Sequence, residues 1–162
     1  MTFLVPFDGS ALSRAALERA RAYATAVNDA PDWVRETLQL DGPAEVVAVS
    51  VIPESARYAR EKGWLDDTEP FDRRAVAAGL RDQVLGVDPA ATFEFEFADA
   101  AANAGTISKR LRQLAEADHV SVVFIGSEHA GRIITPVTSV GGGVAASRSY
   151  DVHIVRRELA DG

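Results

Sequence analysis

The chain has 162 residues, of which 47% are hydrophobic and 25% charged, as is ordinary for a single globular domain. Asp and Glu number 24 against 17 for Lys and Arg, and the net charge of −7 argues against broad nucleic-acid binding, which needs a cationic face. The sequence has no cysteine, which excludes a disulfide, a thiolate metal site and a cysteine nucleophile. No apolar run is long enough to span a bilayer and no basic segment opens the chain, so we expect no membrane segment, no signal peptide and a cytoplasmic location.

The first half of the chain is predicted to contain two buried strands and a helix between them. Residues 2–7 form a short apolar run, and Asp8-Gly9-Ser10 after it is a turn and cap signature. Alanines at four-residue spacing between positions 16 and 24 then predict an amphipathic helix of about four turns. Residues 45–52 are apolar almost throughout and predict the second strand.

Two further segments show neither the spacing of an amphipathic helix nor the pattern of a strand. Residues 31–43 predict an added helical turn or two, in which Trp33 and Leu38 are expected to belong to a small hydrophobic cluster. Residues 54–72 are polar and include two large aromatic side chains. This second segment is either a lid over a site or a plain surface excursion, and the excursion is the commoner case.

The second half of the chain continues the alternation of helix and strand. An apolar stripe between residues 76 and 84 predicts one helix, and another is predicted from Thr106. Residues 92–97 alternate strictly between aromatic and acidic side chains, which predicts a half-exposed strand at a sheet edge. The run 122–125 predicts a strand buried on both faces, and 152–156 predicts the last strand.

The stretch from residue 121 to residue 150 contains the candidate anion site. Its strand stops at Gly126 and is expected to lead through a loop to Thr138-Ser139, which are good N-cap residues before three glycines and an alanine-rich helix. Unpaired N–H groups at a helix start, the helix dipole and neighbouring glycines together suit a phosphate. The alternative is that Gly126 only ends the strand and that the triplet, from Gly141 on, lets the helix pack closely on the sheet.

The order of the predicted elements favours an α/β fold over residues 1–162: a three-layer, Rossmann-like sandwich with an open five-stranded parallel sheet and helices on both faces. Ligands of such sheets bind beyond the carboxyl ends of the strands, where the winding direction reverses. The loops 7–10 and 126–139 suit that place. Neither a Ser-His-Asp set nor a pair of carboxylates can be argued from the spacing, and the three histidines do not converge, so no catalytic or metal-binding residue is predicted.

The start of the chain, VPFDGSALSRAAL, and its end, from VVFIGS to HIVRR, resemble the universal stress protein family over nearly the whole length. The family pattern of an apolar strand, Asp, a small residue, Ser and an alanine-rich helix is matched by Asp8, Gly9, Ser10 and Ser13. The family's nucleotide-binding members carry Gly, two residues, Gly, nine residues, Gly and then Ser or Thr, and they bind ATP. The resemblance therefore implies a fold of the adenine nucleotide α-hydrolase type with ATP as the cofactor, with or without magnesium.

This chain keeps that glycine motif only in part. Gly126 is the first glycine, but His129 stands where the second belongs, and Gly131 lies two residues further on. In one register Ser139 takes the place of the family's Ser or Thr, and a threonine precedes it where the last glycine should be. In the other register Gly131, nine residues and Gly141 preserve the second half of the spacing. Both registers stay open.

The resemblance also implies which residues meet the nucleotide. Pro6 and Asp8 match positions beside the base and ribose, and Val51 matches a position whose backbone meets the adenine. The remaining matches lie in the phosphate loop and at the following helix start. The full set of candidate binding residues is Pro6, Asp8, Val51, Gly126, His129, Gly131, Arg132, Ser139, Val140 and Gly141.

Several of these residues have a second interpretation. Asp8 would also cap the first helix through the N–H of Ser10 or Ala11. His129 would bind phosphate when protonated, or would simply be exposed on a loop. Glu128 and Pro136 weaken the phosphate interpretation, because a carboxylate repels phosphate unless a cation intervenes and proline lacks an N–H.

Three functions are compatible with the sequence. The first is a nucleotide-binding regulatory protein of the universal stress type, with at most weak ATP hydrolysis. The second is a dimeric protein-interaction module that has lost ATP and binds a protein client. The third, an ATP pyrophosphatase-like enzyme, ranks last because residues 7–10 are not that class's Ser-Gly-Gly phosphate loop. The apolar run 152–155, expected at a sheet edge, predicts a homodimer with this strand at the two-fold axis, and the family resemblance implies the same dimer.

Overall fold

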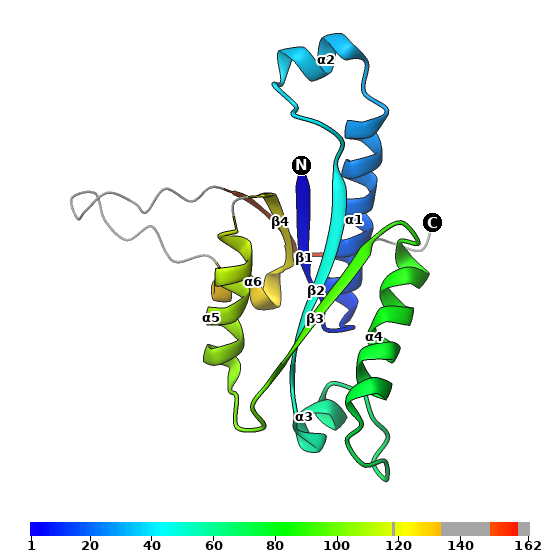
Figure 1. Cartoon of the computed structure of the whole chain (residues 1–162), viewed down its shortest axis with the longest axis vertical. Coiled ribbons are helices and arrows are strands. Elements are labelled where there is room, and N and C mark those ends of the chain that lie inside the picture. The colour runs from blue at the N-terminus through cyan, green and yellow to red at the C-terminus, as the bar shows by residue number, and fades with distance from the viewer. Residues whose placement is uncertain (118, 134–149, 159–162) are drawn as a thin grey trace, which may run out of the picture.

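The computed structural model describes residues 1–117, 119–133 and 150–158, and within them five strands form one parallel sheet (Figure 1). The strands are β1 (Thr2–Pro6), β2 (Glu45–Pro53), β3 (Thr92–Ala98), β4 (Val120–Gly126) and β5 (Asp151–Val155). Their order across the sheet is β3-β2-β1-β4-β5, so β1 is central and β3 and β5 lie at the edges. The predicted open five-stranded parallel sheet is confirmed.

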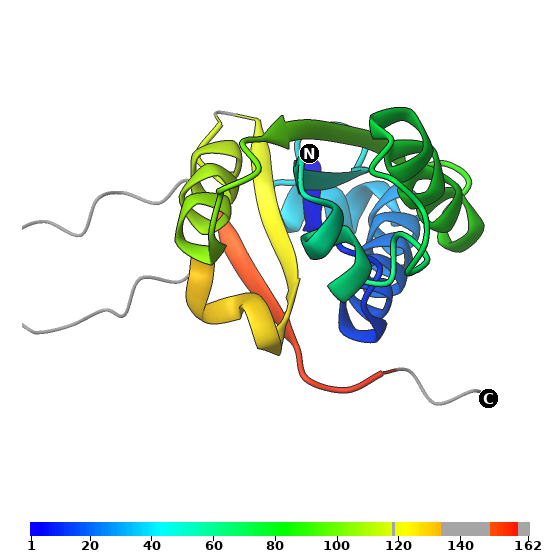
Figure 2. The ribbon, with the colours of Figure 1, turned by 90° about the horizontal axis from the view of Figure 1, so that it is seen from below.

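Helices cover both faces of this sheet. They are α1 (Ala11–Asn28), α2 (Asp32–Thr37), α3 (Ala56–Glu61), α4 (Arg73–Val87), α5 (Ala104–Ala115) and α6 (Ser127–Ile133). Figures 1 and 2 show α1 and α4 on one face and α5 and α6 on the other. The predicted three-layer arrangement is therefore present.

Each long helix begins at a side-chain cap that the sequence supplies. Ser10, Asp72 and Asn103 accept hydrogen bonds from backbone N–H groups two or three residues later, at the starts of α1, α4 and α5. The alanines predicted to line one face of α1 are buried against the sheet. Small side chains on this face let the helix lie close to β1 and β4, which holds the β1–α1 turn in a fixed place.

The hydrophobic core is divided by the sheet into two clusters. Phe3 and Val5 of β1 belong to the cluster under α1 and α4, whereas Leu4 belongs to the cluster under α5. The same alternation places Phe124 and Ile125 of β4 on opposite faces, each about as inaccessible as the other. Strands buried on both faces are expected at the centre of a parallel sheet, and the prediction for residues 122–125 is confirmed.

The strand β3 lies at the sheet edge, as its alternating sequence predicted. Phe93, Phe95 and Phe97 form a row of rings with centroids 5.7 and 5.6 Å apart. Phe95 is 45% exposed, so this edge is half-buried. On the other face Glu96 accepts two hydrogen bonds from the Arg110 guanidinium of α5, each 2.6 Å long.

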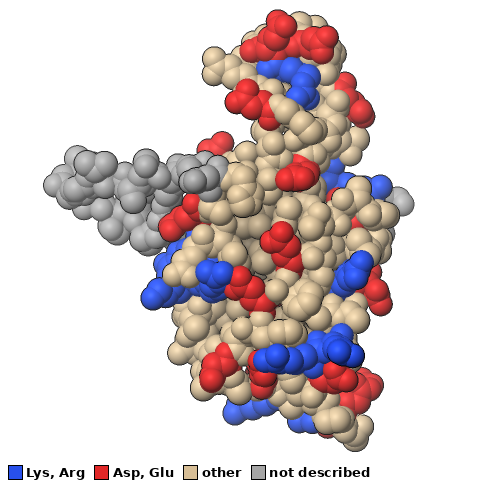
Figure 3. Space-filling view, in the orientation of Figure 1, with Lys and Arg blue, Asp and Glu red and all other residues tan. Residues whose placement is uncertain are grey.

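The prediction that Trp33 and Leu38 belong to a small hydrophobic cluster is wrong. The short helix in this segment exists, but the two side chains are 70% and 62% exposed. Figure 1 shows the reason: α2 follows the far end of α1, beyond the end of the sheet, where none of the five strands formed by the described residues lies against it. Acidic side chains gather over α2 at the top of the molecule (Figure 3).

The segment after β4 also differs from its prediction. A loop was expected from Gly126 onward, but α6 starts directly after the strand at Ser127. Residues 127–130 contain neither glycine nor proline, and Glu128 in the first turn is favourable beside the positive end of the helix dipole. Ala130 is buried against the α5 side of the core, which anchors the new helix.

Among the described residues, no helix has the length and apolar character needed to cross a membrane.

Candidate ligand-binding pocket

The winding direction of the sheet reverses between β1 and β4. The chain adds β2 and β3 on one side of β1 and β4 and β5 on the other. At the carboxyl ends of these strands lies a pocket of about 410 Å³, including the part open to solvent. This is the place where ligands of open α/β sheets bind, and where the sequence predicted a site.

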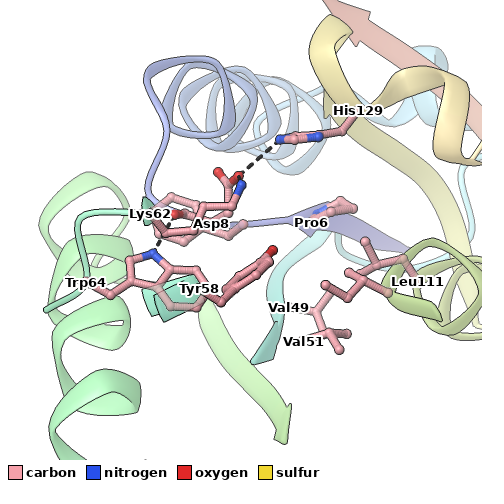
Figure 4. Close-up of a pocket in the computed structure, with 11 residues that line it drawn as sticks. Pro6, Asp8, Val49, Val51, Tyr58, Lys62, Trp64, Leu111 and His129 are labelled. Atoms are coloured by element: carbon pink, nitrogen blue, oxygen red, sulfur yellow. Dashed lines mark hydrogen bonds and ion pairs between the residues drawn. The ribbon is translucent and has the colours of Figure 1, made fainter. Parts of the chain in front are cut away.

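The pocket combines an apolar slot with a cluster of charged groups (Figure 4). The apolar part comes from β2 and α5, and the polar part from the β1–α1 turn, the segment after α3, and α6. The lining residues are Pro6, Phe7, Asp8, Val49, Val51, Tyr58, Lys62, Trp64, Ile107, Leu111 and His129. Four predicted site residues are thus brought together: Pro6, Asp8, Val51 and His129.

The β1–α1 turn holds Asp8 in place. The N–H of Phe7 donates to the carbonyl of Val49 at 2.8 Å, and the buried Ser50 hydroxyl donates to the Phe7 carbonyl at 2.6 Å. After Asp8 the chain turns at Gly9, whose φ of +79° favours glycine. Asp8 Oδ1 accepts a hydrogen bond from the N–H of Ser10 at 2.9 Å. The predicted bond between Asp8 and the start of α1 is therefore present, and it leaves the second carboxylate oxygen for the pocket.

That second oxygen meets two nitrogen donors. Asp8 Oδ2 lies 2.8 Å from Lys62 Nζ and 3.0 Å from His129 Nε2. All three side chains are largely buried. Burial alone would raise the pKa of Asp8, but hydrogen bonds from His129, Lys62 and Ser10 together lower it well below its ordinary value. Asp8 is therefore an anion in the folded protein at neutral pH.

The segment from residue 54 to residue 72 covers one side of the pocket. Its helix α3 ends in a Schellman motif. The N–H of Gly63 donates to the Arg60 carbonyl at 3.0 Å, and the N–H of Trp64 donates to the Ala59 carbonyl at 2.8 Å. Gly63 has a φ of +73°, as this cap requires. The turn places Lys62 and Trp64, on either side of the glycine, next to Asp8.

Trp64 joins this segment to the sheet. Its indole Nε1 donates to the main-chain carbonyl of Asp8 at 2.8 Å. Its ring lies 5.6 Å from the ring of Tyr58, and the Lys62 ammonium lies 5.8 Å from the centre of the Tyr58 ring. The interpretation of residues 54–72 as a plain surface excursion is wrong, because three of their side chains line the pocket.

Lys62, Tyr58 and Trp64 were not among the residues predicted for the site. One signal in the sequence could have drawn attention to them. Lysine is scarce in this chain, occurring only at positions 62 and 109, and Lys62 lies between two large aromatic residues in an otherwise polar segment. A lone lysine beside aromatic side chains differs from the solvated basic residues elsewhere, most of which are arginine.

Gly126 has a packing role in the structure. A Cβ built on it would lie 2.8 Å from the Cβ of Leu12, so the end of β4 approaches the start of α1 more closely than any other residue allows. Gly126 does not line the pocket. This agrees with the packing alternative for this glycine, while its contact with a ligand remains a prediction.

The helix α6 carries the other predicted residues of the β4 end. His129 points into the pocket rather than into solvent, so the interpretation as an exposed loop residue is wrong. Its Nδ1 atom is buried and has no hydrogen-bond partner among the described residues. Gly131 is exposed in α6, and Arg132 follows it in the same helix. Glu128 is exposed and is not a lining residue, so it does not place a carboxylate in the pocket.

The remaining predicted site residues, Ser139, Val140 and Gly141, lie outside the described residues, as do Thr138 and Pro136. Both registers of the glycine motif therefore stay open. Within the described ranges, no three His, Asp or Glu side chains are grouped as a metal site would require.

Comparisons with known proteins give one structural match. No family model matches the chain, and no curated protein matches it. Among solved structures, the chain is similar to one described as a crystal structure of a universal stress protein in complex with cAMP. The two share 18% sequence identity with a TM-score of 0.45, over 96% of this chain and 97% of that chain.

Proposed function

We propose that this chain is a regulatory protein of the universal stress type that binds an adenine nucleotide, ATP, at the carboxyl ends of β1 and β4. The pocket there also takes residues from β2, and the β4 end contributes through His129 of α6. The observation that supports this most is the composition of the pocket. An apolar slot from β2 and α5 lies beside a buried carboxylate that is paired with a lysine and a histidine. A nucleotide offers the matching parts: an aromatic base, a sugar with hydroxyl groups, and an anion.

The apolar slot suits a purine base. Val49 and Val51 come from β2, while Ile107 and Leu111 come from α5, and all four line the pocket and belong to one packed cluster. Figure 4 shows Val49, Val51 and Leu111 together on one side of the pocket. A wall of branched aliphatic side chains excludes water from the face of a flat ring that lies against it.

The charged cluster suits the sugar and the phosphates. An ionised carboxylate such as Asp8 accepts hydrogen bonds from hydroxyl groups, which are the donors that a ribose presents. Lys62 and a protonated His129 would carry the positive charge that a phosphate needs. The sequence resemblance independently implies the same role for Asp8.

The second candidate function is a dimeric interaction module without a nucleotide. One observation favours it: both oxygens of Asp8 already accept hydrogen bonds from within the chain, as they would in a cluster that only holds α3 and α6 on the sheet. The two functions predict different results when ATP is added, because only the first requires that the pocket bind it.

Calorimetric titration with ATP and magnesium tests the proposal. We expect saturable binding by the parent protein and a raised melting temperature. Asp8→Ala should weaken binding by at least about tenfold, the size of a lost hydrogen bond to a charged group. Asp72→Ala is the matched control, because it removes a helix cap at α4 away from the pocket and should lower stability by about 1 kcal/mol without changing affinity. Equal affinity of the Asp8 variant and the parent, or no binding by the parent, would contradict the proposal.

A further inference from the structure

Lys62 has a position in the pocket that the proposed function alone does not explain. Its side chain is 26% exposed, and its ammonium group points at the carboxylate of Asp8 rather than toward solvent. The cap that ends α3 and the indole hydrogen bond of Trp64 to Asp8 fix the main chain on both sides of it. A lysine on a flexible surface loop would not be held in this way.

We propose that Lys62 is the residue that makes the pocket select phosphorylated ligands over the corresponding nucleosides. This inference rests on the proposed function and adds the ligand class. The lysine stands between Asp8 and the phosphate, donates to both, and cancels the repulsion between them.

The charge on Asp8 affects which ligands the pocket can hold. Asp8 is ionised and is held in the pocket by its neighbours. A phosphate placed near this carboxylate would be repelled strongly, because the buried surroundings screen charge far less than water does. A pocket that contained Asp8 alone would therefore favour a neutral nucleoside. A cation beside the carboxylate reverses that preference.

Lys62 also has hydrogen-bond donors to spare for a phosphate. An ammonium group has three N–H donors, and among the described residues Lys62 uses one of them, on Asp8 Oδ2. His129 Nε2 carries at most one hydrogen, and it faces the same carboxylate oxygen, so the lysine rather than the histidine has N–H donors left for a phosphate. Lys62 can thus bind phosphate without releasing Asp8, which remains available to the sugar.

The Lys62 ammonium also has an aromatic neighbour. The Tyr58 ring lies beneath the ammonium, at 5.8 Å from its centre, and packs on Trp64. A ring face in this position stabilises a cation and shields it from water. Shielding strengthens the attraction between Lys62 and a phosphate.

Titrations of adenosine, AMP and inorganic tripolyphosphate test the inference. The parent protein should bind AMP at least about tenfold more tightly than adenosine, since a hydrogen bond to a charged group is gained. In Lys62→Met this preference should disappear or reverse. Lys109→Met is the matched control, because the second lysine is exposed on α5 outside the pocket, and both affinities should stay at the parent values.

The outcomes separate the two proposals. If the parent binds adenosine and AMP equally well, the inference about Lys62 is overturned and the nucleotide pocket stands. If the parent binds no adenine compound, the proposed function fails, and tripolyphosphate decides about Lys62. If tripolyphosphate raises the melting temperature of the parent and not of Lys62→Met, Lys62 still binds phosphate groups. If it raises neither melting temperature, the inference about Lys62 is overturned together with the proposed function.

Discussion

The Nζ atom of Lys62 and the Oδ2 atom of Asp8 are 2.8 Å apart, although 54 positions separate the two residues in the chain. This ion pair joins the end of α3 to the turn after β1, and His129 adds α6 to the same oxygen. One carboxylate thereby connects segments from three parts of the chain. Removing it leaves a largely buried ammonium group unpaired, which is more costly than the loss of an ion pair on the surface.

The variant Asp8→Asn should lower the free energy of unfolding at neutral pH by about 1–3 kcal/mol, because it removes charge-assisted hydrogen bonds from Lys62 and His129. The effect should depend on pH. Because the pKa of Asp8 is lowered in the folded protein, the unfolded chain takes up the proton first as the solution is acidified. The contribution of Asp8 is therefore complete well above its ordinary pKa of 3.8 and is lost as the pH falls below that value.

Urea denaturation of the parent and of Asp8→Asn between pH 7 and pH 3 measures this contribution. The difference in unfolding free energy between the two proteins should be constant at the neutral end and should shrink toward the acidic end. The same series with Asp72→Asn shows how much any helix-capping carboxylate contributes. A difference for Asp8 that grows on acidification would show that its pKa is not lowered in the folded state.

The two tryptophans should report on different environments. Trp33 is 70% exposed in α2, while Trp64 is partly buried at the pocket and donates a hydrogen bond to the Asp8 carbonyl. We expect Trp33→Phe, which keeps only Trp64, to emit at shorter wavelength and to be quenched less by acrylamide than Trp64→Phe. Addition of ATP should change the emission of Trp33→Phe and leave that of Trp64→Phe unaltered. A response to ATP in Trp64→Phe would place the ligand elsewhere.

Gly126→Ala should destabilise the fold by about 1–3 kcal/mol, since the added methyl group would lie 2.8 Å from the Leu12 side chain and force β4 away from α1. Gly79→Ala is the matched control. Gly79 is exposed in the middle of α4 with no atom within 4 Å of the new Cβ, so alanine there should stabilise the helix by about 0.5–1 kcal/mol. Thermal and chemical denaturation distinguish the two. Equal stability of Gly126→Ala and the parent would show that the end of β4 can move away from Leu12 at little cost in free energy.

We expect a homodimer with β5 at the two-fold axis. The strand lies at the sheet edge, and Val152 and Ile154 are only partly buried against the core. A partly exposed apolar edge favours association with a second copy. Light scattering should give the mass of a dimer at micromolar concentration. Val152→Asp should shift the protein toward the monomer, while Phe95→Asp at the opposite edge should not, and a monomeric parent would contradict the expectation.

The sequence predicted those parts of the fold whose side chains have only one suitable environment. Continuous apolar runs such as 45–52 are buried on both faces of the sheet, and the alternation in 92–97 fits only an edge strand. Asp8 could be predicted as a site residue for a similar reason. It follows the first strand directly, and the carboxyl end of a central strand is where the chain reverses its winding.

The parts that were missed depend on contacts between distant segments. Nothing in residues 54–72 shows that Lys62 and Trp64 turn back to Asp8, because that result needs both the cap at Gly63 and the position of β1. Trp33 was predicted wrongly for the opposite reason. An apolar side chain does not have to be buried, and the described residues around α2 leave Trp33 70% exposed.

The central place of β1 determines the order in which the sheet can be completed during synthesis. Thr2 pairs with Glu45 on one side and with Val120 on the other. β1, which is made before the other four strands, therefore obtains its second neighbour only after synthesis has passed Val120. Until then one long side of β1 has its main-chain hydrogen-bonding groups unpaired. Nascent chains halted before β4 should be bound by chaperones and cut by proteases far more readily than chains that include it.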